Sequence, residues 1–352
     1  MVDYVVVGLG LAGISFCEQL EKNNKTFKVI SDASQTSSIV AGGLYNPVIL
    51  KRFTLAWNAK HQLETAKPFY LNLENKLNVK LDYKVPVYRK FASIEEQNIW
   101  FEAADKNVLQ PFLSAQIKNN TNAGINAPFG YGEVLNTGRI DTKKLLKAYY
   151  SYLKAKDVIE DETFDFDTLV INKDHIIYKE IKARKIVFAT GYGLKSNPYF
   201  NYLPLNGTKG ELLTIKAPDL KENNVIKSSV FIIPLGEDLY RVGATYKWKD
   251  KSNVPTLAAK EELLQKLDTF MKCDYTIVNH VAGIRPTVAD RRPLLGKHPE
   301  HLHMYVLNGF GSRGVMIAPY ASNLLLKYIE SNKALPAEID ISRFTKKYYK
   351  PL

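Results

Sequence analysis

The chain has 352 residues, of which 45% are hydrophobic, and this length suits two structural units at roughly 150 residues per domain. The composition excludes a disordered or fibrous protein. Its 48 basic and 36 acidic residues give a net charge of +12, mostly from scattered lysine, which favours a solvated surface over a nucleic-acid groove. No stretch approaches the roughly 20 apolar residues of a membrane span, and no basic leader precedes the first strand, so we expect a cytoplasmic protein without membrane contact.

The first predicted strand, Tyr4–Val7, runs directly into a glycine pattern and then into a helix. Gly8, Gly10 and Gly13 have the GxGxxG spacing, in which the glycines allow a tight turn, a close phosphate and a helix packed near the sheet. The helix N-terminus adds free N–H groups. The pattern predicts a pyrophosphate site, and the alternative is a glycine-rich turn that binds nothing. The predicted ligands are Gly8, Gly10, Leu11, Ala12 and Gly13.

The second predicted strand, Phe27–Ile30, should end in an acidic residue about 20 positions after the glycines, where it would bind the ribose hydroxyls. The usual spacing reaches Ser31, and Asp32 follows it, so either residue is a candidate ribose ligand. The next segment, Gln35–Phe53, is rich in hydroxyl groups and glycine, which lets the backbone lie against a planar ligand. We expect it to form a wall of the cofactor site through Ser37, Ser38, Ala41, Gly42 and Gly43.

From Val79 the sequence changes to a strand-like alternation of apolar and polar residues, followed by a polar helix and a surface loop at Asn119–Gly132. This change indicates an inserted lobe. A helix is predicted within Gly138–Lys156, with Asp141 as its N-cap. Its apolar side should pack on the sheet through Leu145, Leu146, Tyr149, Tyr150 and Leu153.

A buried parallel strand is predicted at Ala183–Gly193, because the run ARKIVFATGYG has a continuous buried-type strand pattern and stops at a threonine beside a glycine. The carboxyl end of such a strand lies at the ligand edge of the sheet, which places Ala189, Thr190 and Gly191 beside the nucleotide. The later stretch KGELLTIKAP and a hairpin around Gly236–Asp238 are typical of an antiparallel sheet. A further helix is expected at Ala258–Met271.

Eight motifs in chain order resemble those of the D-amino-acid oxidase (DAO) family of FAD-dependent oxidoreductases, the group of glycine oxidase, sarcosine oxidase and the tRNA wobble-uridine oxidase domain. They are VVVGLGLAG at Val5–Gly13, AGG at Ala41–Gly43, GRID at Gly138–Asp141, KIVFATG at Lys185–Gly191, RVGAT at Arg241–Thr245, AGIRP at Ala282–Pro286, ADRRPLLG at Ala289–Gly296 and GFGSRGVMIAP at Gly309–Pro319.

The resemblance implies an α/β fold with a Rossmann-like FAD-binding domain of the glutathione-reductase type and a smaller α+β substrate domain with a mostly antiparallel sheet. The FAD-binding domain would comprise residues 1–78, 136–202 and 280–352, and the substrate domain residues 79–135 and 203–279. FAD would be bound without a covalent bond, since no cysteine follows Cys273, and Cys17 is expected to be a buried core residue.

The loop that leads into the last helix, expected at about Ala318–Tyr328, resembles the family segment whose N–H groups stabilise negative charge on reduced flavin. The matching residues are Gly309, Gly311, Ser312, Arg313, Gly314, Val315 and Met316.

Three residues are candidates for the catalytic site. Arg285 matches the arginine that binds a substrate carboxylate in amino-acid oxidases, and its alternative is an ion pair with Asp290. Phe231 stands where such oxidases carry a tyrosine, so one hydroxyl of the usual carboxylate site is missing. Arg241 matches a lysine of sarcosine oxidase that promotes the reaction with oxygen, and its alternative is an outward-facing strand residue.

Two other basic residues, Lys51 and Arg52, are expected on the surface rather than at the flavin. No metal site is expected, because His298, His301 and His303 lack a fourth ligand and should face solvent.

The predicted reaction is hydride transfer from an amine or amino-acid-like small molecule to FAD, which gives an imine, with oxygen or another electron acceptor reoxidising the flavin. The alternatives are a tRNA wobble-uridine oxidase activity, which would make nucleic acid a partner, and a non-catalytic flavoprotein. The pattern does not indicate an oligomeric state.

Overall fold

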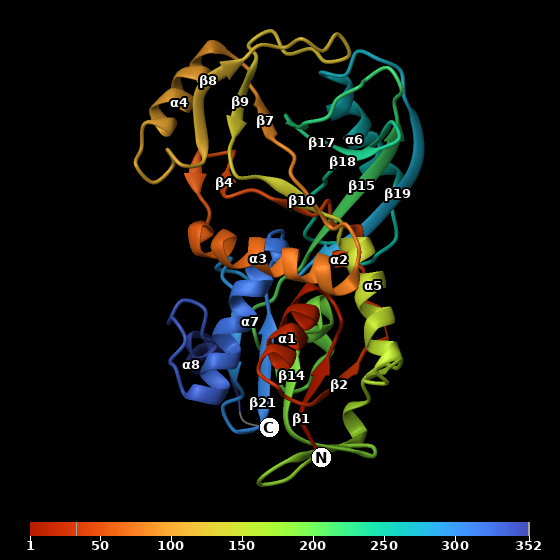
Figure 1. Ribbon diagram of the computed structural model, residues 1–352, viewed down its shortest axis with the longest axis vertical. Helices are drawn as coiled ribbons and strands as arrows, with labels where there is room; N and C mark the ends of the chain where they lie inside the picture. Colours follow the sequence, from red (N-terminus) through yellow and green to blue (C-terminus); the bar gives the residue numbers. More distant parts are fainter. Residues whose placement is uncertain (33, 351–352) are drawn as a thin grey trace.

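A mostly parallel sheet forms the lower half of the molecule in Figure 1, which shows the computed structural model; the structure describes residues 1–32 and 34–350. At its centre β1 pairs in parallel with β2 on one side and with β14 on the other, and β21 continues the parallel arrangement beyond β14. The strands are β1 (Val2–Val7), β2 (Phe27–Ile30), β11 (Ile159–Glu160), β12 (Leu169–Ile171), β13 (Ile176–Tyr178), β14 (Ile181–Phe188), β20 (Leu294–Lys297) and β21 (Met304–Asn308).

Helices cover this sheet and carry the largest part of the core. The last long helix, α7, packs against α1 and α3, and buried side chains from all three join one hydrophobic cluster with the sheet. The helices of this part are α1 (Leu11–Lys22), α2 (Ser37–Val40), α3 (Ala59–Leu77), α5 (Thr142–Ala155), α7 (Gly314–Ser331) and α8 (Ser342–Tyr348), with short 3-10 turns η1 (Phe166–Thr168) and η2 (Gly191–Ser196).

The upper half of Figure 1 contains a second sheet, in which every pairing is antiparallel except that of β16 with β7. Helix α6 (Leu257–Asp268) packs on one face of it and buries Leu263 and Leu267. Helix α4 (Ile94–Ala104) packs beside β8. The strands, in sheet order, are β19 (Thr276–Arg285), β15 (Thr208–Lys216), β18 (Leu239–Gly243), β17 (Phe231–Gly236), β16 (Val225–Lys227), β7 (Val87–Lys90), β9 (Tyr131–Val134) and β8 (Leu113–Lys118).

Two small sheets complete the fold. One of them joins the segment after α2 to the GRID strand, because β10 pairs with both β3 and β6. These sheets contain β3 (Leu44–Tyr45), β10 (Gly138–Ile140) and β6 (Asp82–Tyr83), and β4 (Val48–Ile49) with β5 (Thr54–Leu55). The mixed architecture, with one mostly parallel and one mostly antiparallel sheet, agrees with the fold class predicted from the sequence.

Several predicted elements have shifted limits. Strand β9 begins at Tyr131 and so overlaps the last two residues of the predicted loop, and β19 runs through residue 280, where a domain boundary was expected. In α5 the predicted N-cap Asp141 accepts a hydrogen bond from the Lys144 N–H at 3.0 Å, as expected. Tyr150 is 38% exposed rather than packed on the sheet, because its hydroxyl donates to Asp161 at the surface.

The closing helix begins at Gly314, four residues before the predicted start, although it contains Pro319. A proline removes the N–H that would bond the carbonyl four residues earlier, here that of Val315. The buried Tyr70 hydroxyl on α3 donates to this carbonyl at 2.9 Å and replaces the missing bond. The early start therefore depends on a tertiary contact that sequence periodicity does not contain.

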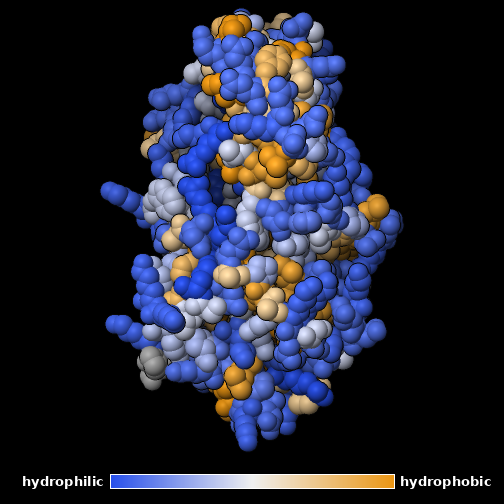
Figure 2. All heavy atoms as spheres, turned by 90° about the vertical axis from the view of Figure 1, so that its left-hand side faces the viewer, coloured by the Kyte–Doolittle hydropathy of each residue, from blue (hydrophilic) through white to orange (hydrophobic). Residues whose placement is uncertain are grey.

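The surface seen from the left-hand side of Figure 1 is mostly hydrophilic, with hydrophobic residues exposed in small separate groups (Figure 2). Within the described part of the chain, no helix combines the length and the apolar character that crossing a bilayer requires.

Candidate cofactor and substrate site

A cavity of about 1040 Å³ is lined by residues from both large sheets. The predicted cofactor residues that line it are Gly8, Gly10, Leu11, Ala12, Ser31, Asp32, Ser37, Ser38, Ala41, Gly42, Gly43, Ala189, Thr190, Gly191, Gly311, Ser312, Gly314 and Val315. Gly13, Gly309, Arg313 and Met316 do not line it. Met316 is instead 1% exposed in the hydrophobic core, and Gly309 packs against Val288 and Leu294.

At one end of the cavity, glycine backbone replaces side chains. Gly8 has a φ of +99°, and a Cβ there would lie 2.7 Å from the Ala189 carbonyl oxygen. A Cβ on Gly13 would lie 2.0 Å from the Gly8 oxygen, so this glycine lets α1 approach the turn. The N-cap Gly10 has no capping side chain, and the first turn of α1 has no acidic residue. The positive end of the helix is therefore available to an anion.

Asp32 follows β2 and is oriented by two hydrogen bonds. Its Oδ1 accepts from the Ser34 N–H at 2.9 Å and its Oδ2 from the Thr163 hydroxyl at 2.9 Å. Burial alone would raise the pKa of this carboxyl, but the bonds from Ser34 and Thr163 outweigh it and hold the pKa below its usual value. Asp32 is therefore an ionised acceptor, and Ser31 lines the cavity beside it.

The same end contains residues that the sequence analysis missed. Glu162, Thr163, Phe164 and Phe166 line the cavity because β11 pairs in parallel with β2, so the carboxyl ends of the two strands meet. A two-residue strand carries no periodic signal, and only this edge rule would have found them.

The AGG loop contacts the antiparallel sheet at the middle of the cavity. A Cβ on Gly42 would lie 2.7 Å from Cδ1 of Ile233 and 3.7 Å from the Phe231 ring. Phe231 and Ile233 both line the cavity, so this glycine allows the loop to approach β17 closely. Elsewhere on the wall, a Cβ added to Gly191 or Gly311 would meet no atom within 4 Å, which leaves their backbone open toward the cavity.

Arg285, the last residue of β19, lines the cavity on the side of the antiparallel sheet. Its Nη1 donates to the Thr245 carbonyl at 3.2 Å, and its guanidinium carbon lies 5.4 Å from the centre of the Tyr246 ring. The predicted alternative is wrong, because Asp290 pairs with Arg343 at 2.9 Å. No carboxylate of the described residues pairs with Arg285, and burial lowers the pKa of its guanidinium. Arg285 is therefore a mostly buried guanidinium on the cavity wall, with no carboxylate partner among the described residues.

Arg241 lies on β18 opposite Thr214 and Ile233 but does not line the cavity. It is not an outward-facing strand residue, because its Nη1 is buried and has no partner among the described residues. Burial lowers the pKa of its guanidinium, and the positive charge of Arg139 lowers it further. Arg139, on β10, was not singled out by the sequence analysis; its own Nε is also buried without a partner.

The remaining predictions have mixed outcomes. Lys51 and Arg52 are exposed, as expected, and burial raises the pKa of the Cys17 thiol inside α1. His298 is completely buried rather than solvent-facing, because its Nδ1 accepts the N–H groups of Glu300 and His301. Among the described residues, no group of three or more histidine, cysteine, aspartate or glutamate side chains is placed to hold a metal ion.

Known proteins share both the sequence pattern and the fold. Glycine oxidase of Bacillus subtilis is 26% identical over 223 residues, which are 58% of this chain and 60% of that protein. The tRNA 5-methylaminomethyl-2-thiouridine biosynthesis bifunctional protein MnmC of Aromatoleum aromaticum is 26% identical over 176 residues, 44% of this chain and 28% of that protein. The matches thus cover less than two thirds of either relative.

Two solved structures have the same fold at low identity. Glycine oxidase from Bacillus cereus has a TM-score of 0.77 at 18% identity, covering 95% of this chain and 96% of its own. L-proline dehydrogenase from P. horikoshii has a TM-score of 0.78 at 15% identity, covering 99% of both chains. The family model described as FAD dependent oxidoreductase (DAO) matches residues 3–327, which confirms FAD as the predicted cofactor. A match of this extent establishes that the chain belongs to the DAO family of FAD-dependent oxidoreductases.

Proposed function

We propose that this protein oxidises the C–N bond of a small amine that carries a carboxylate, giving an imine that water hydrolyses. Bound FAD supplies the hydride acceptor for this reaction. The observation that carries the proposal is Arg285, a cation in the cavity wall that has no carboxylate partner among the described residues. A guanidinium presents two parallel N–H donors, which match the two oxygens of a carboxylate.

The cavity residues fit FAD from end to end. The open N-terminus of α1 suits a pyrophosphate, and the ionised Asp32 suits the ribose hydroxyls. The backbone of Gly311 to Val315 at the start of α7 suits the negative edge of a reduced flavin. We assign these contacts, without a covalent bond, to a unit made of residues 1–78, 136–202 and 280–352, and the substrate site to residues 79–135 and 203–279 together with Arg285 and Pro286 just beyond their boundary.

The residues around Arg285 bind and orient the substrate and exclude water from it. Gly210, Leu212, Phe231, Ala244 and Pro286 line this part of the cavity and carry no titratable side chain. The substrate amine must therefore lose its proton to solvent before the carbon next to its nitrogen gives up a hydride. Apolar walls favour this neutral form of the amine. Phe231 contributes a ring and no hydroxyl, so Arg285 holds the carboxylate without a tyrosine at that position.

Arg241 and Arg139 supply positive charge behind the cavity wall. Each has a buried nitrogen without a hydrogen-bond partner among the described residues. The nearby negative charge is that of Asp141, whose Oδ2 lies 3.8 Å from Nη1 of Arg139. Fixed charge in a water-poor site stabilises negative charge that develops nearby. We assign to Arg241 the role of favouring electron transfer to oxygen or another acceptor.

A tRNA wobble-uridine group is the second candidate substrate. It is supported by the match to MnmC and by two exposed aromatic rings on which bases can stack. Tyr246, beside Arg285, is 43% exposed, and Trp248, whose ring centre lies 5.3 Å from that of Tyr246, is 47% exposed. A tRNA-binding assay over a salt series separates the two candidates, because phosphate contacts make nucleic-acid affinity fall steeply with salt. Cytoplasmic location stays a prediction from the sequence.

Turnover of matched substrate pairs tests the proposal. N-methylglycine and D-alanine are each compared with the amine that lacks only the carboxylate, dimethylamine and ethylamine, and the carbonyl product is measured. We expect turnover for a carboxylate-bearing member and at least tenfold lower kcat/KM for its partner. Equal turnover of both members would remove the carboxylate from the proposal.

A further inference from the structure

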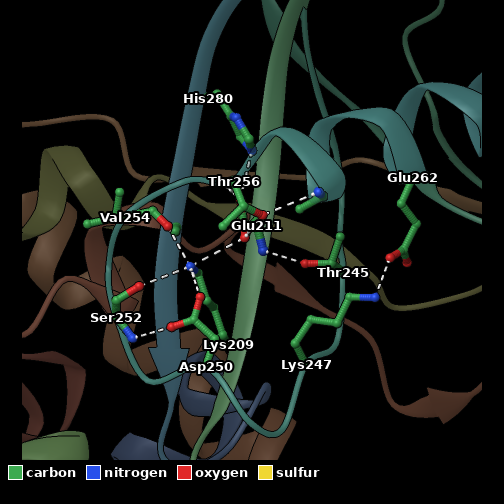
Figure 3. Close-up of polar contacts among 12 residues, drawn as sticks. Lys209, Glu211, Thr245, Lys247, Asp250, Ser252, Val254, Thr256, Glu262 and His280 are labelled. Carbon is green, nitrogen blue, oxygen red and sulfur yellow. Dashed lines mark hydrogen bonds and ion pairs between the residues drawn. The ribbon is translucent and has the colours of Figure 1, made fainter.

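Three consecutive residues near the start of β15 connect Arg285 with a buried polar network. The middle residue is a glycine beside Arg285, and its two neighbours are buried charged residues. Gly210 faces the cavity, and a Cβ there would lie 2.0 Å from Nη2 of Arg285. Successive strand residues point to opposite faces, so Lys209 and Glu211 extend away from the cavity. Figure 3 shows both side chains meeting residues of the chain that follows β18, among them Asp250 and Thr256.

Lys209 is a completely buried lysine. Its Nζ donates to Asp250 Oδ2 at 2.6 Å, to Ser252 Oγ at 3.2 Å and to the Val254 carbonyl (Figure 3). A buried ammonium without such partners would be strongly unfavourable. The side chain therefore fixes three points of one loop against β15.

Glu211 is 1% exposed and fixes the end of the same loop. Its carboxylate accepts from the Thr256 N–H at 2.7 Å and from the Thr256 hydroxyl at 2.9 Å (Figure 3). Thr256 is the N-cap of α6, so the carboxylate also lies at the positive end of that helix. His280 Nε2 lies 3.0 Å from Glu211 Oε2, in a geometry that does not make a hydrogen bond.

The fixed segment, Thr245–Thr256, is called the anchored loop below. It is also joined to β15 by backbone bonds, since Lys209 and Lys247 exchange N–H···O contacts of 2.9 and 3.0 Å. The Glu211 N–H donates to the Thr245 hydroxyl at 2.9 Å. At this same end, the Thr245 carbonyl accepts from Arg285 and the Tyr246 ring lies against its guanidinium. One loop thus contacts the buried pair on one face and Arg285 on the other.

We propose that Lys209 and Glu211 are positioning residues for substrate recognition: they fix the anchored loop, and the loop fixes the guanidinium of Arg285. The inference rests on the proposed role of Arg285. Lys209 Nζ lies 3.4 Å from Glu211 Oε1, so the two buried side chains also form an ion pair. A buried ion pair contributes little net stability compared with apolar residues of the same size, but it requires one geometry of its partners. A guanidinium held in one geometry binds a carboxylate more tightly, because less freedom is lost on binding.

Carboxylate binding to the FAD-loaded protein tests this inference without turnover. Acetate is titrated against the absorbance spectrum of the bound flavin, and acetamide serves as its uncharged counterpart. For Lys209→Met and Glu211→Gln we expect the Kd of acetate to rise about tenfold or more, with unchanged FAD content and unchanged acetamide binding. Lys185→Met is the matched control, since it removes an ion pair with Glu330 far from Arg285 and should leave acetate binding unchanged.

Two further variants make each outcome decisive. Asp250→Asn removes the negative charge of one partner of Lys209 at a side chain that is 40% exposed, so it tests the loop even if the buried variants do not fold. Arg285→Met tests the underlying assignment. If Arg285→Met leaves acetate binding unchanged, the proposed function fails. If Arg285→Met weakens it while the three network variants lower only the unfolding temperature, the network is structural and the inference is overturned.

Discussion

Replacing Arg285 by methionine removes the proposed carboxylate ligand while keeping an unbranched side chain in place of the aliphatic stem. A bidentate contact to a carboxylate comprises two charge-assisted hydrogen bonds, each contributing about 1.5–3 kcal/mol. Together they contribute about 3–6 kcal/mol, and since about 1.4 kcal/mol is a factor of ten, kcat/KM should fall by about 10² to 10⁴. Lysine at this position keeps the charge but not the planar fork, so Arg285→Lys should fall between the two.

The assay is steady-state kcat/KM for the best carboxylate-bearing amine, measured at equal FAD content. The same variants are assayed with the matched amine that lacks the carboxylate, for which we expect little change. FAD binding should also be unchanged, because Arg285 lies on the antiparallel sheet and Gly8–Ala12 at the β1–α1 turn, and no carboxylate of the described residues would lose a partner. A fall of less than threefold for the carboxylate-bearing amine, or an equal fall for both amines, would refute the reasoning.

Three further predictions concern the cofactor site and the fold. Gly13→Ala should greatly reduce the flavin bound per protein, because the new Cβ would lie 2.0 Å from the Gly8 oxygen and displace the turn. Tyr70→Phe should lower the free energy of unfolding in urea by about 1–3 kcal/mol, because it leaves the Val315 carbonyl without a partner. Glu330→Gln should make the free energy of unfolding depend less on pH in acid. Burial raises the pKa of Glu330, but hydrogen bonds from Lys185 and other groups outweigh burial and lower the pKa from 4.5 to about 2. The stabilisation by the ionised carboxylate is therefore lost as the pH falls between these two values.

Each of these has a control on the same structural element or type. The control for Gly13→Ala is Ser15→Ala, which removes a buried hydroxyl on α1 that has no partner among the described residues and should leave flavin binding normal. Full flavin content in Gly13→Ala would contradict the close approach of α1 to the Gly8 turn. Tyr275→Phe loses only an exposed bond to Asp268 and should cost less than Tyr70→Phe. If the unfolding free energy of Glu330→Gln depends on pH below 4.5 as steeply as that of the unchanged protein, the assigned cause of acid sensitivity is wrong.

Local patterns predicted those parts of the fold whose signals lie within one segment. The turn from β1 into α1 and the hairpin of β17 and β18 are specified by glycine spacing and strand alternation, and both formed where expected. Elements that depend on distant partners were missed. The start of α7 needs Tyr70 from α3, and the position of Thr163 at the ribose end needs the short strand β11.

The candidate site, too, was predicted where the signal lies within one segment and missed where it depends on distant partners. Motif resemblance singled out Arg285 and Phe231, and both line the cavity. The same resemblance did not reveal that Asp290 pairs with Arg343, 53 residues later, which removes the alternative partner of Arg285. Nor did it indicate that Lys209 and Glu211 are buried, because alternating charges on a strand are usually solvated.

Whether bound FAD accepts hydride from a carboxylate-bearing amine is measured by an anaerobic titration of the FAD-loaded protein with N-methylglycine, glycine and D-amino acids. We expect at least one of them to bleach the flavin absorbance fully, and the amine without its carboxylate to do so far less effectively. If the flavin stays oxidised with every member of the panel, yet is bleached by dithionite, the proposed function is wrong.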